Sequence, residues 1–154
     1  MEPVKQPKTS SDEKYIHVNI TSPEGDIYAH RSYGCRVHTI DGWLTILPDH
    51  LPIVTVLDIG AVIVTRLNDD QPDYIAINGG ALTFQNNTLD IAATYAIRAR
   101  NIDEAHVKLM KNQAEADMQE ALSKDKRSAY RRAQVRLNRA INQINVSAHR
   151  KHKR

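Results

Sequence analysis

Histidine side chains are the groups most able to do chemistry in this 154-residue sequence, and their spacing argues against a local metal site. None forms a pair four residues apart on a predicted helix, the spacing that places two ligands on one helix face. Seven histidines are present: His17, His30, His38, His50, His106, His149 and His152. A metal site would need residues from distant segments, so we predict none.

Motifs typical of catalysis are also absent from the sequence. There is no phosphate loop and no Gly-x-Ser-x-Gly nucleophile elbow. Gly79-Gly80 follows one predicted strand and precedes another, so we interpret the pair as a sharp turn or bulge rather than a phosphate cradle. Cys35 is the only cysteine, which excludes an internal disulfide. We therefore predict a non-catalytic protein; a small cytosolic enzyme would rest only on the scattered histidines.

The predicted secondary structure that must position these residues changes from strands to helices near Asn101. From Tyr15 to about Ile97, short β-branched runs alternate with turn residues, as in Ile16-His17-Val18-Asn19-Ile20. Turns are predicted at residues 22–26, 41–42, 58–60, 68–73 and 86–87, and the one at 58–60 would divide residues 53–67 into two strands. No helix intervenes, so we predict an antiparallel β-sandwich or barrel over residues 15–99.

Two amphipathic helices are predicted after this β domain, which makes the fold class α+β. The first helix would be capped by Asn101 and run to about Leu122, and after a polar break at 123–126 the second would span 127–146. An antiparallel hairpin over residues 100–147 is the simplest arrangement. The first helix's apolar line would be Ile102, Ala105, Leu109 and Ala116. The second's would be Tyr130, Ala133, Leu137, Ala140, Ile141 and Ile144, with Arg132, Arg136 and Arg139 on the opposite side.

The ends and the charge distribution complete this interpretation. Residues 1–14 lack the apolar core of a signal peptide and are predicted to be a disordered leader, and residues 148–154 a frayed basic tail. No run approaches the roughly 20 apolar residues of a membrane span. Residues 1–100 contain 8 Lys and Arg against 12 Asp and Glu, whereas residues 101–154 contain 13 against 6. The basic hairpin indicates either an acidic partner or a solvated surface.

A nucleic-acid-binding module is the main alternative function. The sequence pI near 9.0 and the arginines of the second helix favour it. The aromatic content of 5% argues against it, because the basic face lacks interleaved rings for base stacking.

Three stretches of the chain resemble a known family. They are residues 41–54 (DGWLTILPDHLPIV), residues 74–82 (YIAINGGAL), and residues 89–93 (LDIAA) followed by 101–105 (NIDEA). Together they are similar to the epsilon subunit of bacterial F-type ATP synthase, over residues 15 to about 147. The resemblance implies the same fold and a central-stalk role, in which the subunit couples ion flow to ATP synthesis and its hairpin restrains ATP hydrolysis.

The resemblance also implies partners and site residues. The β domain would contact the gamma subunit and the c-subunit ring through Trp43, Leu44, Pro48 and His50, with Trp43 and Leu44 near the tip of a hairpin at residues 40–46. Arg132, Arg136 and Arg139 would meet acidic residues of the alpha/beta headpiece. Capping of the β domain by Trp43, a structural hydrogen bond from His50 and simple solvation of the arginines are the alternatives. The chain would lie on the cytoplasmic face of the bacterial cell membrane, attached only through partner subunits, and would bind no nucleic acid.

Some members of this family bind ATP through the motif Ile/Leu-Asp-x-x-Arg-Ala, and here the motif is degenerate. It includes Ile102 and Asp103, but His106 and Val107 replace the Arg and Ala. Outside it, Ile97 replaces an upstream acid, Arg139 is retained and Gln143 replaces a second arginine. A neutral histidine lacks the charged fork that arginine offers a phosphate. We therefore predict weak or no ATP binding, and no other cofactor. Two further departures, Thr45 and Asp49 where the family usually or often has Gly, should affect only turn geometry.

Overall fold

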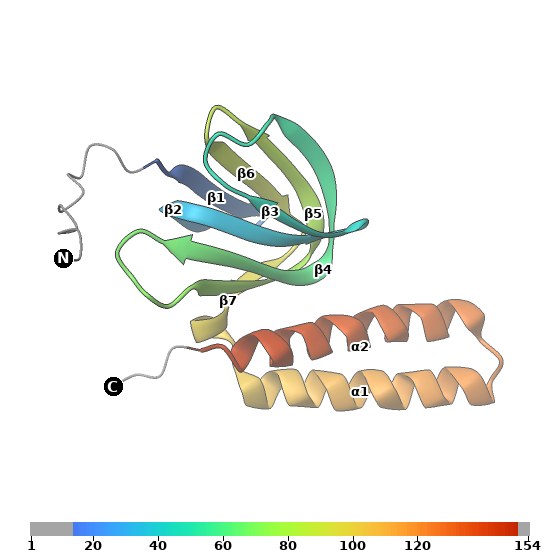
Figure 1. Ribbon diagram of the computed structural model, residues 1–154. Coiled ribbons are helices and arrows are strands. Elements are labelled where there is room, and N and C mark those ends of the chain that lie inside the picture. The colour runs from blue at the N-terminus through green and yellow to red at the C-terminus, as the bar shows by residue number, and fades with distance from the viewer. Residues whose placement is uncertain (1–13, 151–154) are drawn as a thin grey trace, which may run out of the picture.

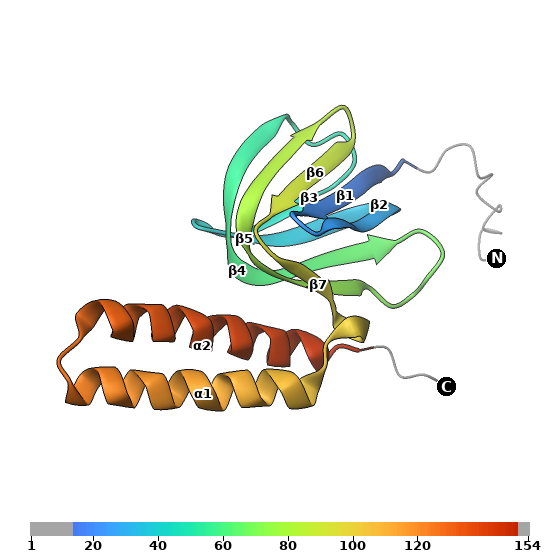
Figure 2. The ribbon, with the colours of Figure 1, turned by 180° about the vertical axis from the view of Figure 1, so that it is seen from behind.

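The computed structural model describes residues 14–150 and contains a closed β-barrel with a helical hairpin packed along one side (Figures 1 and 2). This arrangement confirms the predicted order of a β domain followed by a hairpin. The strands are β1 (Ile16–Ser22), β2 (Gly25–Thr39), β3 (Gly42–Ile46), β4 (Ile53–Arg66), β5 (Asp73–Gln85), β6 (Thr88–Ala93) and β7 (Ala96–Arg98).

The sheet closes on itself because β1 pairs with two strands. The order is β1-β6-β5-β4-β2-β3, with an additional β1–β2 pairing, and β7 pairs with β5. All pairings are antiparallel except β1 with β6, which are parallel. The parallel pair joins strands far apart in the sequence, and the local alternation that indicated each strand holds no information about it.

Alternating residues fill the barrel, but the alternation changes phase inside two long strands. In β4 the residues that point into the core change from odd-numbered (Leu57) to even-numbered (Val62). The same change occurs in β5 between Ile77 and Leu82. The turn predicted at 58–60 is therefore wrong, because β4 runs through it and only its facing pattern shifts. The sharp turn or bulge predicted at Gly79-Gly80 is wrong as well, because β5 pairs with β4 in one register on both sides of it.

The two glycines of β5 allow this shift. Gly79 and Gly80 have φ values of 98° and 150°. A Cβ at Gly80 would lie 2.2 Å from the carbonyl oxygen of Ala92 on β6. Only glycine fits there without displacing backbone, so the pair serves strand packing and is not a phosphate cradle.

The predicted helices are present, with a different start. After a 3₁₀ turn at Ala99–Asn101, α1 spans Glu104–Ser123 and α2 spans Arg127–Ser147. The cap of α1 is Asp103, whose carboxylate accepts a hydrogen bond from the His106 backbone N–H at 3.2 Å. Asn101, the predicted cap, instead ends the 3₁₀ turn. The polar break falls at 124–126, as predicted.

Packing within the hairpin uses small residues seven positions apart. Val107, Ala114 and Ala121 are the buried residues of α1. The predicted line was wrong beyond Ile102, because Ala105, Leu109 and Ala116 are exposed. On α2 most of the predicted line is buried or half-buried, centred on Ala133 and Ala140, while Ile141 is exposed. The helix α2 lies between α1 and the barrel (Figure 1).

The predicted leader, residues 1–14, lies outside the described part of the chain except for Lys14. Of the predicted tail, residues 151–154 also lie outside it. His149 and Arg150 are described and both contact the rest of the protein. The frayed tail predicted from His149 onward is therefore wrong for these two residues.

Candidate functional site

The junction between hairpin and barrel is lined mainly by small apolar residues. Ala76 of β5, Ala99, Ile102, Val107, Ala140 and Val146 form one buried cluster, with Ala61, Tyr74, Ile97 and Ile144 packed around it. Small side chains let α2 approach the sheet closely but bury little area, so apolar contact alone stabilises the junction weakly.

Polar contacts at the end of α2 supplement this cluster. The Asn142 side-chain amide donates to the Gly60 carbonyl at 3.0 Å and to the Ile77 carbonyl at 3.4 Å. The His149 ring stacks on Tyr74 with centroids 4.0 Å apart and planes 5° from parallel. The Arg150 guanidinium donates to the Ile102 carbonyl. These contacts tie the end of α2 to β4, β5 and the start of the hairpin.

The degenerate nucleotide motif lines a hollow of about 500 Å³ at the same junction. The structure brings Asp103, His106, Val107, Arg139 and Gln143 together there with Ile97. Ile102, the first motif residue, is instead buried in the junction cluster.

Two buried polar atoms lining this hollow, Arg139 Nε and Asn78 Oδ1, have no hydrogen-bond partner in the described part of the chain. The charges suit a triphosphate poorly. Arg136 is paired with Asp117 at 2.9 Å, and the Asp103 carboxylate faces any anion. One guanidinium, that of Arg139, remains for a ligand with several negative charges.

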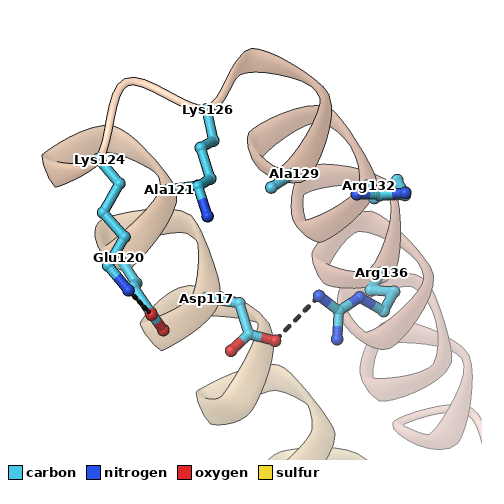
Figure 3. A pocket seen from close by; sticks show the side chains of 8 residues that line it. All are labelled: Asp117, Glu120, Ala121, Lys124, Lys126, Ala129, Arg132 and Arg136. Carbon is cyan, nitrogen blue, oxygen red and sulfur yellow. Dashed lines mark hydrogen bonds and ion pairs between the residues drawn. The ribbon is translucent and has the colours of Figure 1, made fainter.

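A second hollow, of about 440 Å³, lies between the helices at their connected ends (Figure 3). Lys124, Lys126, Arg132 and Arg136 line it together with Asp117 and Glu120. Lys124 pairs with Glu120 at 2.5 Å, and this hydrogen bond lowers the pKa of Glu120. Lys124 is thus paired within the end of α1, and Arg136 of α2 is paired across the hollow with Asp117 of α1.

The three arginines predicted to form one surface are distributed over two hollows, with Arg136 lining both. Arg132 is exposed at the hollow between the helices, and Arg136 bridges to α1. Arg139 is half-buried and faces the hollow beside the barrel. Their exposure differs because α2 is covered on two sides, by α1 and by the barrel, whereas the sequence indicates only its apolar side.

The strand pair β2–β3 carries Trp43 and Leu44. Its turn lies at Ile40-Asp41, and Trp43 is half-exposed on β3, 5.0 Å from the His38 ring and 4.5 Å from the Arg36 guanidinium carbon. Trp43 also borders a hollow against the end of α2. Leu44 packs against the barrel core, so of these two neighbouring residues near the turn only Trp43 is exposed.

The β3–β4 connection contains Pro48 and His50, both half-buried. The His50 ring has Nδ1 2.7 Å from the Leu51 carbonyl and lies edge-on to Phe84. Asp49 between them has a φ of 65°, the left-handed region that favours glycine. Glycine would adopt this backbone conformation without strain. Hydrogen bonds from Lys14 and Asn87 lower the pKa of Asp49.

An exposed apolar surface lies next to this connection, and sequence reasoning missed it. We call it the β4 surface. Val54 and Val56 point outward from β4, and the Ile40 N–H donates to the Val56 carbonyl. The side chains of the β4 surface are between 53% and 79% exposed: Ile40, Leu47, Leu51, Val54 and Val56. The β3–β4 connection is at the end of the barrel away from the helices (Figure 1). The signal available in the sequence was the pair of valines at alternate positions of one strand.

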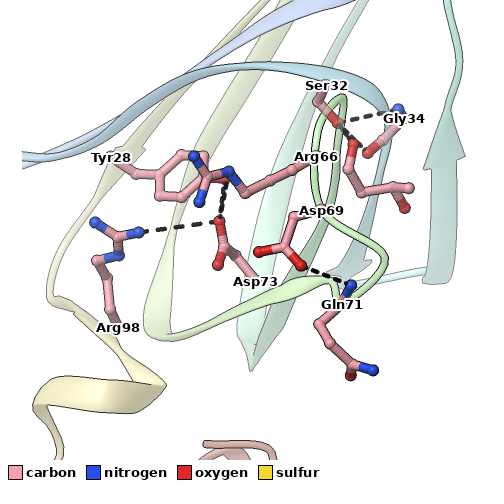
Figure 4. A network of polar contacts seen from close by, with 9 residues as sticks. Tyr28, Ser32, Gly34, Arg66, Asp69, Gln71, Asp73 and Arg98 are labelled. Atoms are coloured by element: carbon pink, nitrogen blue, oxygen red, sulfur yellow. Dashed lines mark hydrogen bonds and ion pairs between the residues drawn. The ribbon is translucent and has the colours of Figure 1, made fainter. Parts of the chain in front are cut away.

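A polar network anchors β7, the last strand before the hairpin (Figure 4). The Tyr28 hydroxyl donates to Asp73 at 2.6 Å, and Arg66 and Arg98 lie 3.6 and 3.9 Å from the same carboxylate. Burial, and then the bond to Asp73, raise the pKa of Tyr28. Arg98 of β7 also lies over the Tyr28 ring. The network therefore fixes the point from which the hairpin departs.

Within residues 14–150, no cluster of three or more His, Cys, Asp or Glu could hold a metal ion. No helix in this part of the chain is long and apolar enough to span a membrane. A barrel with an exposed apolar surface and a weakly held helical hairpin defines a class of docking subunit.

Comparisons with known proteins identify the family. Residues 15–99 match the family described as "ATP synthase, Delta/Epsilon chain, beta-sandwich domain", and residues 100–148 match its "long alpha-helix domain". An ATP synthase epsilon chain of Lactobacillus gasseri is 43% identical over 136 residues, covering 87% of this chain and 93% of the relative. That of Lacticaseibacillus casei is 40% identical over 132 residues, covering 85% and 92%. The chain belongs to the ATP synthase delta/epsilon family as a bacterial epsilon chain, a non-catalytic subunit of the central stalk.

A solved structure supports the fold. One chain in a structure of the Euglena gracilis mitochondrial ATP synthase, described as OSCP/F1/c-ring, aligns with a TM-score of 0.69. The alignment covers 90% of this chain and 85% of that chain at 17% sequence identity. At this identity the likeness shows the fold alone.

Proposed function

We propose that this chain couples ion flow through a membrane ring to ATP synthesis by docking its barrel on the gamma subunit and the c-subunit ring. The observation that carries the proposal is the β4 surface. Five large apolar side chains, each more than half exposed, lie on β4, in the β3–β4 connection and at Ile40, whose N–H bonds to Val56. Exposed apolar clusters of this kind mark protein interfaces. Attachment would be peripheral, on the cytoplasmic face of the bacterial cell membrane.

The hairpin would restrain ATP hydrolysis by contacting the alpha/beta headpiece. Its support is the basic outer surface of α2 and the limited area that holds the hairpin to the barrel. Arg132 is the predicted arginine that the fold leaves most available for such a contact, since Arg136 already binds Asp117. A nucleic-acid role is not favoured, because Lys124 and Arg136 are already paired with acids.

Binding of ATP to this chain would be weak or absent. The hollow at the degenerate motif holds one unpaired guanidinium, Arg139, against the Asp103 carboxylate. Calorimetric titration of the purified chain should therefore show no micromolar affinity. A micromolar dissociation constant would overturn this part of the proposal.

A charge placed on the β4 surface tests the docking role. Leu51→Asp combined with Val54→Asp should sharply reduce recovery of the chain with purified synthase, because two carboxylates would be buried without partners. The control is Leu109→Asp, an exposed leucine on α1 that lies outside the β4 surface. Recovery equal to that of the control would contradict docking through this surface.

A further inference from the structure

We propose that the end of α2 is a built-in latch that holds the hairpin against the barrel without any bound ligand. The latch consists of Asn142, the Tyr74–His149 ring pair and Arg150. The latch would control the hairpin movement on which the proposed restraint of hydrolysis depends, so this inference rests on that proposed function.

Asn142 is the central member because it joins α2 to two strands at once. Its amide nitrogen donates to the carbonyls of Gly60 on β4 and Ile77 on β5, which are paired with each other in the sheet. A Cβ at Gly60 would lie 2.8 Å from the His38 Cβ on β2, so glycine is needed there for β2 and β4 to pack. Without Asn142, both carbonyls would lose this donor while the hairpin still covered them.

The other two members close the same end of the hairpin. His149 stacks flat on Tyr74, one residue after Asp73, where β5 begins to pair with β4. Arg150 bonds to Ile102, which directly precedes the cap of α1. The first turn of α1 and the last turn of α2 are therefore tied to each other and to the sheet.

The rest of the hairpin depends on this end. The helix α1 packs against α2 and has few contacts with the strands. Toward its connected ends the hairpin extends past the barrel (Figure 2). Release of the latch would leave mainly small apolar residues at the junction, which hold the helices weakly.

Thiol labelling of the full-length chain tests the latch. Cys35 is buried in the barrel core, and burial raises its pKa to about 12, so the native chain offers little reactive thiolate. The substitution Ala76→Cys places a thiol on β5 inside the buried junction cluster, where the side chain is 1% exposed and labelling requires the hairpin to lift. In this background, Asn142→Ala should raise the labelling rate about fivefold, which corresponds to about 1 kcal/mol.

The matched control is Asn145→Ala, which removes the same amide from an exposed position on the same helix. Its labelling rate should change less than about twofold. Equal rates for the two variants, or no change with Asn142→Ala, would overturn the latch.

Labelling of Cys35 in chains that lack Ala76→Cys reports unfolding of the barrel. If Asn142→Ala without the introduced cysteine makes Cys35 reactive, that variant has opened the barrel itself. The latch is then tested with His149→Ala in its place, by the same comparison with Asn145→Ala. The assay uses the isolated chain and needs no synthase. It therefore fails or succeeds independently of the proposed restraint of hydrolysis.

Discussion

Gly80 of β5 packs directly against the backbone of β6. Its φ of 150° and the 2.2 Å that would separate an added Cβ from the Ala92 carbonyl oxygen leave no room for a side chain. Gly25, in the β1–β2 turn, also has a positive φ, of 128°, but nothing lies within 4 Å of its Cβ position. Comparing substitutions at these two glycines therefore separates the cost of backbone strain from the cost of a steric clash.

We predict that Gly80→Ala lowers the free energy of unfolding by at least about 3 kcal/mol, because strain and a backbone clash add. Gly25→Ala should cost about 1 kcal/mol, from strain alone. Urea denaturation of both variants measures the difference. Equal losses would show that β5 and β6 are farther apart than described.

The His30 imidazole predicts how the barrel responds to acid. Burial, and then Arg66 and Arg98, lower its pKa below the ordinary value of 6.5, and Asp73 only partly offsets them. A histidine with a depressed pKa in the folded state contributes stability that is present above pH 6.5 and is lost as the pH falls through its folded pKa. Acid should therefore destabilise the barrel through this residue.

We expect the melting temperature to fall more in the native chain than in His30→Gln when the pH drops from about 7.5 to about 5.5. Glutamine removes the titration while keeping a polar side chain of similar length. Parallel melting curves at both pH values would check this. An identical fall in the two chains would assign the acid sensitivity elsewhere.

At the scale of elements, the hairpin is held together by alanines rather than by large apolar residues. Ala114 is buried against α2, whereas Ala116, two positions later, is exposed. We predict that Ala114→Leu destabilises the hairpin by about 1–3 kcal/mol through overpacking. Ala116→Leu should change stability by less than about 0.5 kcal/mol.

Helix content followed by circular dichroism during thermal unfolding distinguishes these two variants. Because Ala116 belonged to the apolar line predicted from the sequence, the pair also decides between that line and the observed packing. A larger effect at Ala116 would favour the line predicted from the sequence.

The sequence predicted the strands and helices well, but it predicted poorly which surfaces they bury against one another. Alternation and turn residues located most strands, and the 3.6-residue period located both helices. The continuity of β4 through Asp58 and Gly60 was missed, because a phase shift within a strand resembles a turn in the sequence. The place of Arg139 was missed because burial by a second layer depends on tertiary packing. The β4 surface was missed because exposed and buried valines have the same local pattern.

At the scale of the whole molecule, the structure divides into a barrel suited to docking and a hairpin suited to movement. The barrel is closed, and Asp73 with Arg98 fixes its last strand. The hairpin is attached through small residues and the latch at the end of α2. This division predicts that the barrel can keep its place in the complex when the hairpin is absent.

The most direct test of the account removes the residues after Arg100 in the assembled synthase and measures ATP hydrolysis together with ion-driven ATP synthesis. The account predicts that hydrolysis rises while synthesis remains coupled, because the barrel still docks and only the restraint is lost. Loss of assembly, or a hydrolysis rate equal to that of the native complex, would contradict it.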